Sequence, residues 1–171
     1  MSAPRWPLER PPDDELGVVV HGPVLLARSP GIAAGLRCVF AHPSGLQLPL
    51  VLRAEGVQAE GAKRSSYTPR LGERSGQAWR GEPWPGPALV AGTDGEERTV
   101  VPGSATSGGG RMLGRTDDGY RFDGLYWMGH LPADSTLHLT IAWPEAGLAK
   151  TTTVLQLADL DELNTRIVQL S

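Results

Sequence analysis

The most regular hydrophobic pattern in the chain runs over residues 46–53. Four leucines alternate there with other residues, namely Leu46, Leu48, Leu50 and Leu52 against Gln47, Pro49, Val51 and Arg53. A period of two is typical of a β-strand with one buried face, so the pattern predicts a strand. Because Pro49 has no N–H to donate, we expect this strand to lie at a sheet edge or to carry a bulge there.

Several other segments have the composition of short strands between turns. They are residues 18–27, 36–42, 88–91, 99–101, 120–128, 136–143 and 151–157. In the second segment, alternation places Leu36, Cys38 and Phe40 on one apolar face. Asp94-Gly95 predicts a tight hairpin turn, and both Trp127 and Trp143 are predicted core residues. Roughly seven or eight strands without β-helix-β units predict an antiparallel β-sandwich of the immunoglobulin-like kind.

The remaining segments do not follow a strand pattern. Residues 1–16 are rich in proline and then acidic, which predicts a flexible arm before a single domain over 17–171. Residues 55–86 lose periodicity and are interpreted as a long loop, and residues 104–110 as a Ser/Gly linker. Leu160, Leu163, Ile167 and Leu170 follow Asp159 at helical spacing. They predict a short C-terminal helix with Asp159 as its N-cap.

Composition narrows the classes of function. The 171 residues include 22 glycines and 15 prolines, which suits many turns in one domain. Sixteen basic and 19 acidic residues give a net charge of −3, which argues against a nucleic-acid partner. A single cysteine excludes an intrachain disulfide. With neither a signal-peptide pattern nor a membrane-spanning run, we expect a cytoplasmic protein without a membrane partner.

The chemical motifs in the chain are weak. Gly103 to Gly108 has the spacing that opens a phosphate loop, but the required Lys-Ser/Thr does not follow. The four histidines are His21, His42, His130 and His138. They do not have chelating spacing, and the alternation turns His138 away from the core. Cys38 is interpreted as a buried, inert thiol. We therefore expect no enzyme activity, no cofactor and no metal site.

Aromatic and basic residues gather in the segment without periodicity. We select Tyr67, Trp79, Arg80 and Trp84 as candidate partner-binding residues. Tryptophan beside arginine is typical of protein-binding hot spots, and it also suits a surface that stacks on sugars. The alternative is structural, because these rings can fold back and cover an open end of the sandwich.

Three stretches carry a resemblance to a known family. They are residues 14–20 with 25–29, the glycine triplet Gly108–Gly110, and residues 126–132 through 137–147. Together they resemble a family of uncharacterised actinobacterial proteins of about this length. The resemblance spans residues 13–54 and 108–165. It implies a single domain and an actinobacterial source, and it implies no activity.

These observations favour a non-catalytic protein-interaction module that presents the 55–86 loop to a protein partner. The alternative hypothesis is a β-sandwich that binds a small ligand or a glycan through the loop tryptophans. An enzyme whose site is assembled from scattered residues is the third hypothesis. A homodimer formed through the edge strand at Pro49 is a further expectation.

Overall fold

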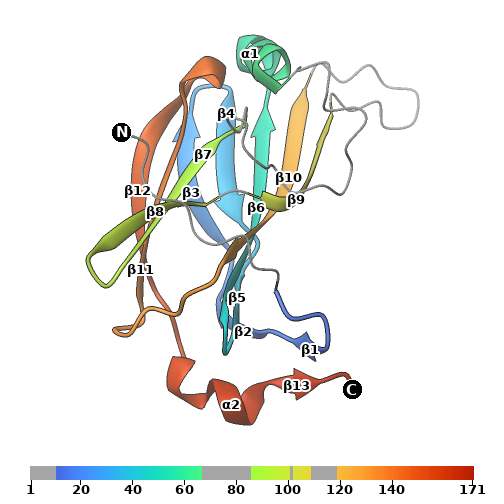
Figure 1. The fold of residues 1–171 in the computed structure, drawn as a ribbon. Helices are drawn as coiled ribbons and strands as arrows, with labels where there is room; N and C mark the ends of the chain where they lie inside the picture. The colour runs from blue at the N-terminus through green and yellow to red at the C-terminus, as the bar shows by residue number, and fades with distance from the viewer. Residues whose placement is uncertain (1–10, 67–85, 101, 109–118) are drawn as a thin grey trace.

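The computed structural model describes residues 11–66, 86–100, 102–108 and 119–171. Two antiparallel sheets make up most of this part of the chain, with helical segments at their ends (Figure 1). The predicted class, a mainly β protein built as an antiparallel sandwich with a short C-terminal helix, is therefore confirmed.

The larger sheet has seven strands, and β6 lies at its centre. On one side β6 pairs with β10, which pairs with β9; on the other it pairs with both β4 and β5, which carry β3 and β2 outside them. The strands are β2 (Val18–His21), β3 (Val24–Ser29), β4 (Ile32–Leu36), β5 (Val39–His42), β6 (Gly45–Ala54), β9 (Pro102–Gly108) and β10 (Tyr120–Met128).

The smaller sheet has four strands in the order β12-β11-β7-β8. They are β7 (Ala88–Thr93), β8 (Glu96–Val100), β11 (Thr136–Trp143) and β12 (Leu148–Gln156). Its edge strand β12 lies beside β3, and two hydrogen bonds connect these strands. Thr153 Oγ1 donates to the Leu26 carbonyl at 3.1 Å, and the Ala149 N–H donates to Ser29 Oγ at 3.2 Å. These bonds join the two sheets along one edge.

The core lies between the two sheets. The four leucines of β6 point into it and are buried, as their alternation predicts. Trp143 is buried in the core as expected and packs edge-to-face on Tyr120 with 5.8 Å between ring centroids. The expectation for Trp127 was wrong, because it pairs with Gln47 on the outer face of the sheet, where it is buried outside the core. The hairpin prediction is also confirmed: Asp94 and Gly95 have φ of 52° and 81°, as a two-residue turn between β7 and β8 requires.

A β-bulge changes the predicted face of the segment after Leu36. Leu36 pairs with Leu50, and Phe40 pairs with Gln47, so four steps along one chain match three along β6. The additional residue inverts the alternation. The expectation for Cys38 and Phe40 was therefore wrong, because both are only half buried while Val39 and Ala41 face the core.

The same bulge explains how Pro49 fits into a central strand. Of the two alternatives expected at Pro49, the edge strand was wrong, since β6 has partners on both sides. A bulge is present at this position, on the facing chain rather than on β6 itself. The Pro49 carbonyl accepts a hydrogen bond from the Arg37 N–H at 3.1 Å, so the backbone of Pro49 faces the bulge. The missing N–H of proline thus falls where the ladder is already interrupted. The edge on which we based the expected homodimer does not exist at Pro49.

The segment interpreted as a loop over 55–86 begins with a helix, α1 (Gly56–Ser66). Its buried face is made of Ala59, Gly61 and Ala62 and packs against the 3₁₀ turn η2 (Pro144–Ala146). A Cβ on Gly61 would lie 2.5 Å from the Glu145 carbonyl oxygen, so the approach requires glycine. Small residues give no hydrophobic period, and this is why the pattern did not predict the helix.

Two further segments form strands where the sequence predicted none. Residues 102–108, which overlap the expected Ser/Gly linker over 104–110, form β9 and pair with β10. Edge pairing uses the backbone alone, so a low-complexity sequence can supply it. At the N-terminal side, β1 (Glu15–Leu16) lies within the expected flexible arm and pairs with β13 (Val168–Gln169) near the end of the chain.

The predicted C-terminal helix is present but short. It consists of the 3₁₀ turn η3 (Leu160–Glu162) and α2 (Leu163–Arg166). Asp159 precedes η3 with φ of 59° and gives no side-chain cap; its carboxylate instead accepts from Arg166 Nη1 at 2.7 Å. The expectation for Leu170 was wrong, because the chain leaves the helix before it and Leu170 is exposed.

Candidate binding surface

The four residues proposed from the sequence for partner binding are Tyr67, Trp79, Arg80 and Trp84. All four lie in 67–85, outside the described residues. The structure therefore neither places them on a surface nor brings them together. The candidate site described below is made from residues of the larger sheet instead.

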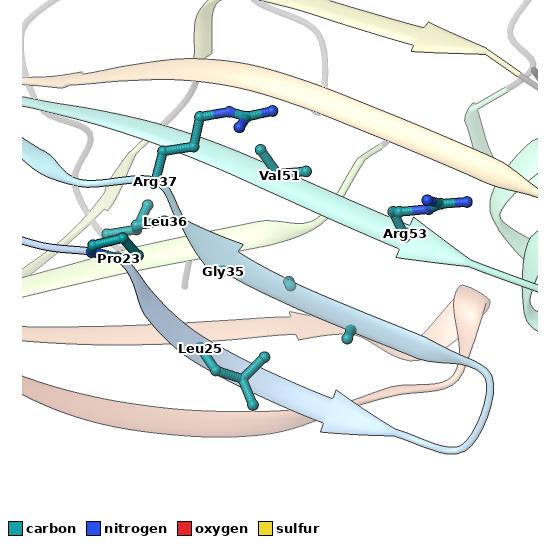
Figure 2. A pocket seen from close by; sticks show the side chains of 9 residues that line it. Pro23, Leu25, Gly35, Leu36, Arg37, Val51 and Arg53 are labelled. Atoms are coloured by element: carbon teal, nitrogen blue, oxygen red, sulfur yellow. The ribbon is translucent and has the colours of Figure 1, made fainter.

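A shallow hollow lies on the outer face of the seven-stranded sheet, the face turned away from the smaller sheet. Its volume is about 460 Å³, within the range of ordinary ligand sites. Its walls come from β3, β4 and β6, and Figure 2 shows Arg37 and Arg53 on either side of Val51. The residues that line it include Pro23, Leu25, Ala33, Gly35, Arg37, Val51 and Arg53.

The hollow forms because the middle strand carries small side chains. Ala33 and Gly35 are the outward residues of β4. In the sheet register, Gly35 lies between Leu25 of β3 and Val51 of β6. A Cβ on Gly35 would lie 2.7 Å from the Val24 carbonyl oxygen, so glycine is required for the approach of β3. Because Gly35 has no side chain, the apolar floor of the hollow is left uncovered at this position.

Leu25 keeps its outward position because β3 has a bulge. The register shifts between Leu25 and Ala27, so that Leu26 and Ala27 both turn to the core. Leu25 remains 51% exposed. An exposed leucine alone requires no explanation, but one that forms the wall of an apolar hollow marks a surface suited to binding.

A row of arginines crosses the sheet beside the apolar floor. In register, Arg28 of β3 pairs with Ala33, Ala33 with Arg53, and Arg53 with Arg121 of β10. Paired residues of an antiparallel sheet share a face, and all three arginines are exposed. Like charges directly opposite each other destabilise a sheet.

One acidic side chain partly neutralises this surface. Asp123 accepts from Arg121 Nε at 2.7 Å and from its Nη2 at 3.3 Å, and it lies 3.7 Å from Arg37 Nη2. The hydrogen bond to Asp123 raises the pKa of Arg121, so this guanidinium stays charged. Asp123 therefore pairs closely with Arg121 and more loosely with Arg37.

The histidines lie away from the hollow. His42 and Glu15 form a buried pair at 2.9 Å, and Gln169 Nε2 donates to the same carboxylate at 3.1 Å. Trp127 packs edge-on against the His42 ring. A carboxylate that orients an imidazole is an element of many active sites. Here the pair ties the β1–β13 ribbon to the sheet, and its side chains are almost completely closed to solvent.

The other histidines lie at the surface. His130 contacts the Asp94 carboxylate at 2.8 Å, and this hydrogen bond lowers the pKa of Asp94. His21 bonds to the neighbouring Gly22 carbonyl, and His138 is exposed as predicted. Among the residues that the structure describes, no three His, Cys, Asp or Glu side chains gather in a way that could hold a metal ion.

Cys38 lies in the bulge rather than in the core. Its partial burial raises the pKa of the thiol, and the charge of neighbouring Arg37 offsets only part of that rise. A raised pKa keeps the thiol protonated, which is opposite to what a nucleophilic cysteine requires.

Comparison with known proteins identifies no protein family, no curated protein and no solved structure that matches the chain. In the described part of the chain, no helix combines the length and the apolar character needed to span a membrane.

The sequence pattern did not identify Leu25, Arg37, Val51 or Arg53 as binding residues. Val51 and Arg53 alternate with the leucines of residues 46–52, and a valine near an arginine is only a weak indication of a binding surface. The stronger signal is the arrangement of arginines opposite one another. It becomes visible only when the strand register is known.

Proposed function

We propose that the protein is a non-catalytic interaction module that binds a protein partner on the outer face of its seven-stranded sheet. The observation that carries the proposal is the hollow whose apolar floor, between Leu25 and Val51, is flanked by Arg37 and Arg53. Interfaces typically combine an apolar centre with a polar rim, and arginine is among the residues enriched there.

The side chains of the hollow favour binding over catalysis. Its described lining residues are proline, leucine, alanine, glycine, valine and arginine, and include no serine, cysteine, histidine or carboxylate. A nucleophile or general base within reach of a substrate is the usual requirement for hydrolytic and transfer reactions. The lining also has no aromatic ring, and this disfavours glycan stacking at this position.

The proposal is tested by photo-crosslinking from two leucines of nearly equal exposure. A photoreactive amino acid replaces Leu25 in one variant and Leu16, on β1 of the β1–β13 ribbon, in a second; these side chains are 51% and 52% exposed. Both full-length variants are irradiated in native lysate, and the crosslinked peptides are identified by mass spectrometry.

We expect position 25 to capture one partner segment reproducibly, and position 16 to capture none. The control variant Val51→Asp, combined with the photoreactive residue at position 25, should lose that product because it places a charge on the apolar floor. Equal capture from both positions, or capture that Val51→Asp does not change, would refute binding at the hollow.

A further inference from the structure

The β1–β13 ribbon brings together two segments far apart in sequence, and it lies beyond β2 and β5 at one end of the molecule (Figure 1). We infer that this ribbon is a strap, which opens as a unit from the folded sandwich and controls access to His42 and Trp127 on the outer sheet face. Three features support this: the direction of its side chains, the buried contact that holds it, and the surface that it covers.

The ribbon turns polar side chains inward and apolar side chains outward. Glu15 and Gln169 are register partners, so they share a face, and Glu15 reaches His42 from it. Leu16 and Val168, the next pair, point the other way and are about half exposed. Burial of their apolar surface therefore does not hold the ribbon against the sandwich. A two-stranded ribbon by itself is at best marginally stable in water.

A buried polar contact closes the strap. Glu15 Oε1 lies 2.9 Å from His42 Nδ1, and both side chains are almost completely closed to solvent. Gly17, between β1 and β2, permits this approach, because a Cβ there would lie 2.8 Å from His42 Nε2. The net contribution of one hydrogen bond to a charged group is modest. Closure thus depends on a contact that local opening can break.

The chain is anchored in the sandwich on both sides of the ribbon. Val18, the first residue of β2, is buried, and Ile167, the residue before β13, packs against the core. Within the ribbon, the Leu170 N–H donates to the Asp14 carbonyl at 2.7 Å, so its two strands move together. Opening can therefore end at Gly17 and Ile167 while the sandwich stays folded.

The closed strap covers two aromatic rings of the sheet. His42 and Trp127 are both buried, and their rings pack edge-on with 5.7 Å between centroids. In the described part of the chain, the buried Trp127 Nε1 has no hydrogen-bond partner. A buried donor without a partner is costly. Opening frees the His42 ring and gives this donor access to water, which offsets part of the cost of breaking the contact with Glu15.

The inference is tested by hydrogen exchange and NMR of the full-length protein. The signals followed are the Leu170 amide in the strap, the Trp127 indole N–H, and the Leu52 amide of β6, which has partner strands on both sides. The indole signal is assigned by its loss in Trp127→Phe. We expect the Leu170 and Trp127 protons to have similar protection factors, at least about a thousandfold below that of Leu52, because local opening costs less than global unfolding.

Two pairs of variants identify what closes the strap. Glu15→Gln removes the carboxylate and should increase opening by about tenfold or more. Its control Glu97→Gln removes a charge from exposed β8 and should not. Gly17→Ala places a Cβ against the His42 ring and should also increase opening by about tenfold. Its control is Gly22→Ala, where a Cβ would have nothing within 4 Å. Amide spectra establish that each sandwich is folded.

Three results would overturn the inference. Equal protection of Leu170 and Leu52 would mean that the ribbon is released only by global unfolding. Fast exchange at Leu170, with the Trp127 indole protected as strongly as Leu52, would mean that the ribbon frays without uncovering the sheet. If Glu15→Gln had no larger effect than Glu97→Gln, the buried pair would not hold the strap. None of these results bears on partner binding at the hollow, which the crosslinking from Leu25 decides separately.

Discussion

The inner and outer faces of the larger sheet are built by the same strands under different constraints. On β6, the inward residues are leucines that are completely buried, whereas the outward residues Val51 and Arg53 line a hollow open to solvent. On the inner face, each side chain improves the packing. On the outer face, Arg53 lies directly opposite Arg121, and a leucine of β3 is half exposed.

The comparison separates residues that stabilise the fold from residues that are available for binding. The inner face follows the rule that apolar side chains are buried and close-packed. The outer face departs from two rules at adjacent positions, since like charges are opposed and apolar surface is exposed. Departures of this kind are expected at functional sites. We therefore expect substitutions on the inner face to reduce stability, and substitutions on the outer face to reduce binding with little loss of stability.

The largest loss of stability should follow Trp143→Ala. Trp143 is 1% exposed, packs edge-to-face on Tyr120, and donates from Nε1 to Ser65 Oγ of α1 at 3.3 Å. Removing its ring leaves a cavity and releases α1, which should reduce the free energy of unfolding by about 3–5 kcal/mol. Urea denaturation followed by circular dichroism measures this, and an unchanged midpoint would contradict the core position of Trp143.

The sharpest test of the two faces uses neighbouring residues. Leu50→Ala empties a buried site and should cost about 2–5 kcal/mol. Val51→Ala, one residue away on the outer face, removes half-exposed methyl groups and should cost less than about 1 kcal/mol. Both are measured by denaturant unfolding. Similar losses at the two positions would mean that the faces are not distinguished as described.

The smallest effect lies on the other sheet, away from both faces compared above. The hydrogen bond from His130, with a second from the Ala133 N–H, holds the pKa of Asp94 below its ordinary 3.8. A lowered folded-state pKa stabilises the protein above 3.8, and this contribution disappears as pH falls through the folded value. Asp94→Asn keeps a residue that tolerates the positive φ.

Asp94→Asn should therefore destabilise the protein near neutral pH, and its difference from the parent should shrink in acid. Thermal unfolding of both proteins across a pH series measures this difference. A difference that stays constant from neutral to acidic pH would show that Asp94 acts through something other than its charge.

The core could be predicted from sequence because alternation identifies a strand wherever no extra residue interrupts it. The leucines of β6 and the Asp94-Gly95 hairpin follow this rule. Prediction failed after Leu36, where a bulge inverts the alternation. At Pro49 the sequence left an edge strand and a bulge as alternatives, and the bulge lies on the facing chain. A bulge depends on the partner strand, so a single segment does not reveal it.

The candidate site could not be predicted for a related reason. Arg28, Arg53 and Arg121 are far apart in sequence, and only the register of three strand pairs places them in one row. Helix α1 was not predicted because Ala59 and Ala62 pack through small size rather than hydrophobic periodicity. Long-range pairing and close backbone approach thus account for most of what the pattern did not show.

The measurement that most directly tests the central claim compares Leu25→Asp with Leu16→Asp. The two leucines are almost equally exposed, on β3 and on the β1–β13 ribbon, and each variant gains one negative charge. Their affinities are measured by calorimetry for the partner segment that crosslinking identifies. We predict that Leu25→Asp loses binding by a hundredfold or more, about 2.7 kcal/mol, while Leu16→Asp binds as the parent does. Equal affinities of the two folded variants would contradict the assignment of the outer sheet face as the binding surface.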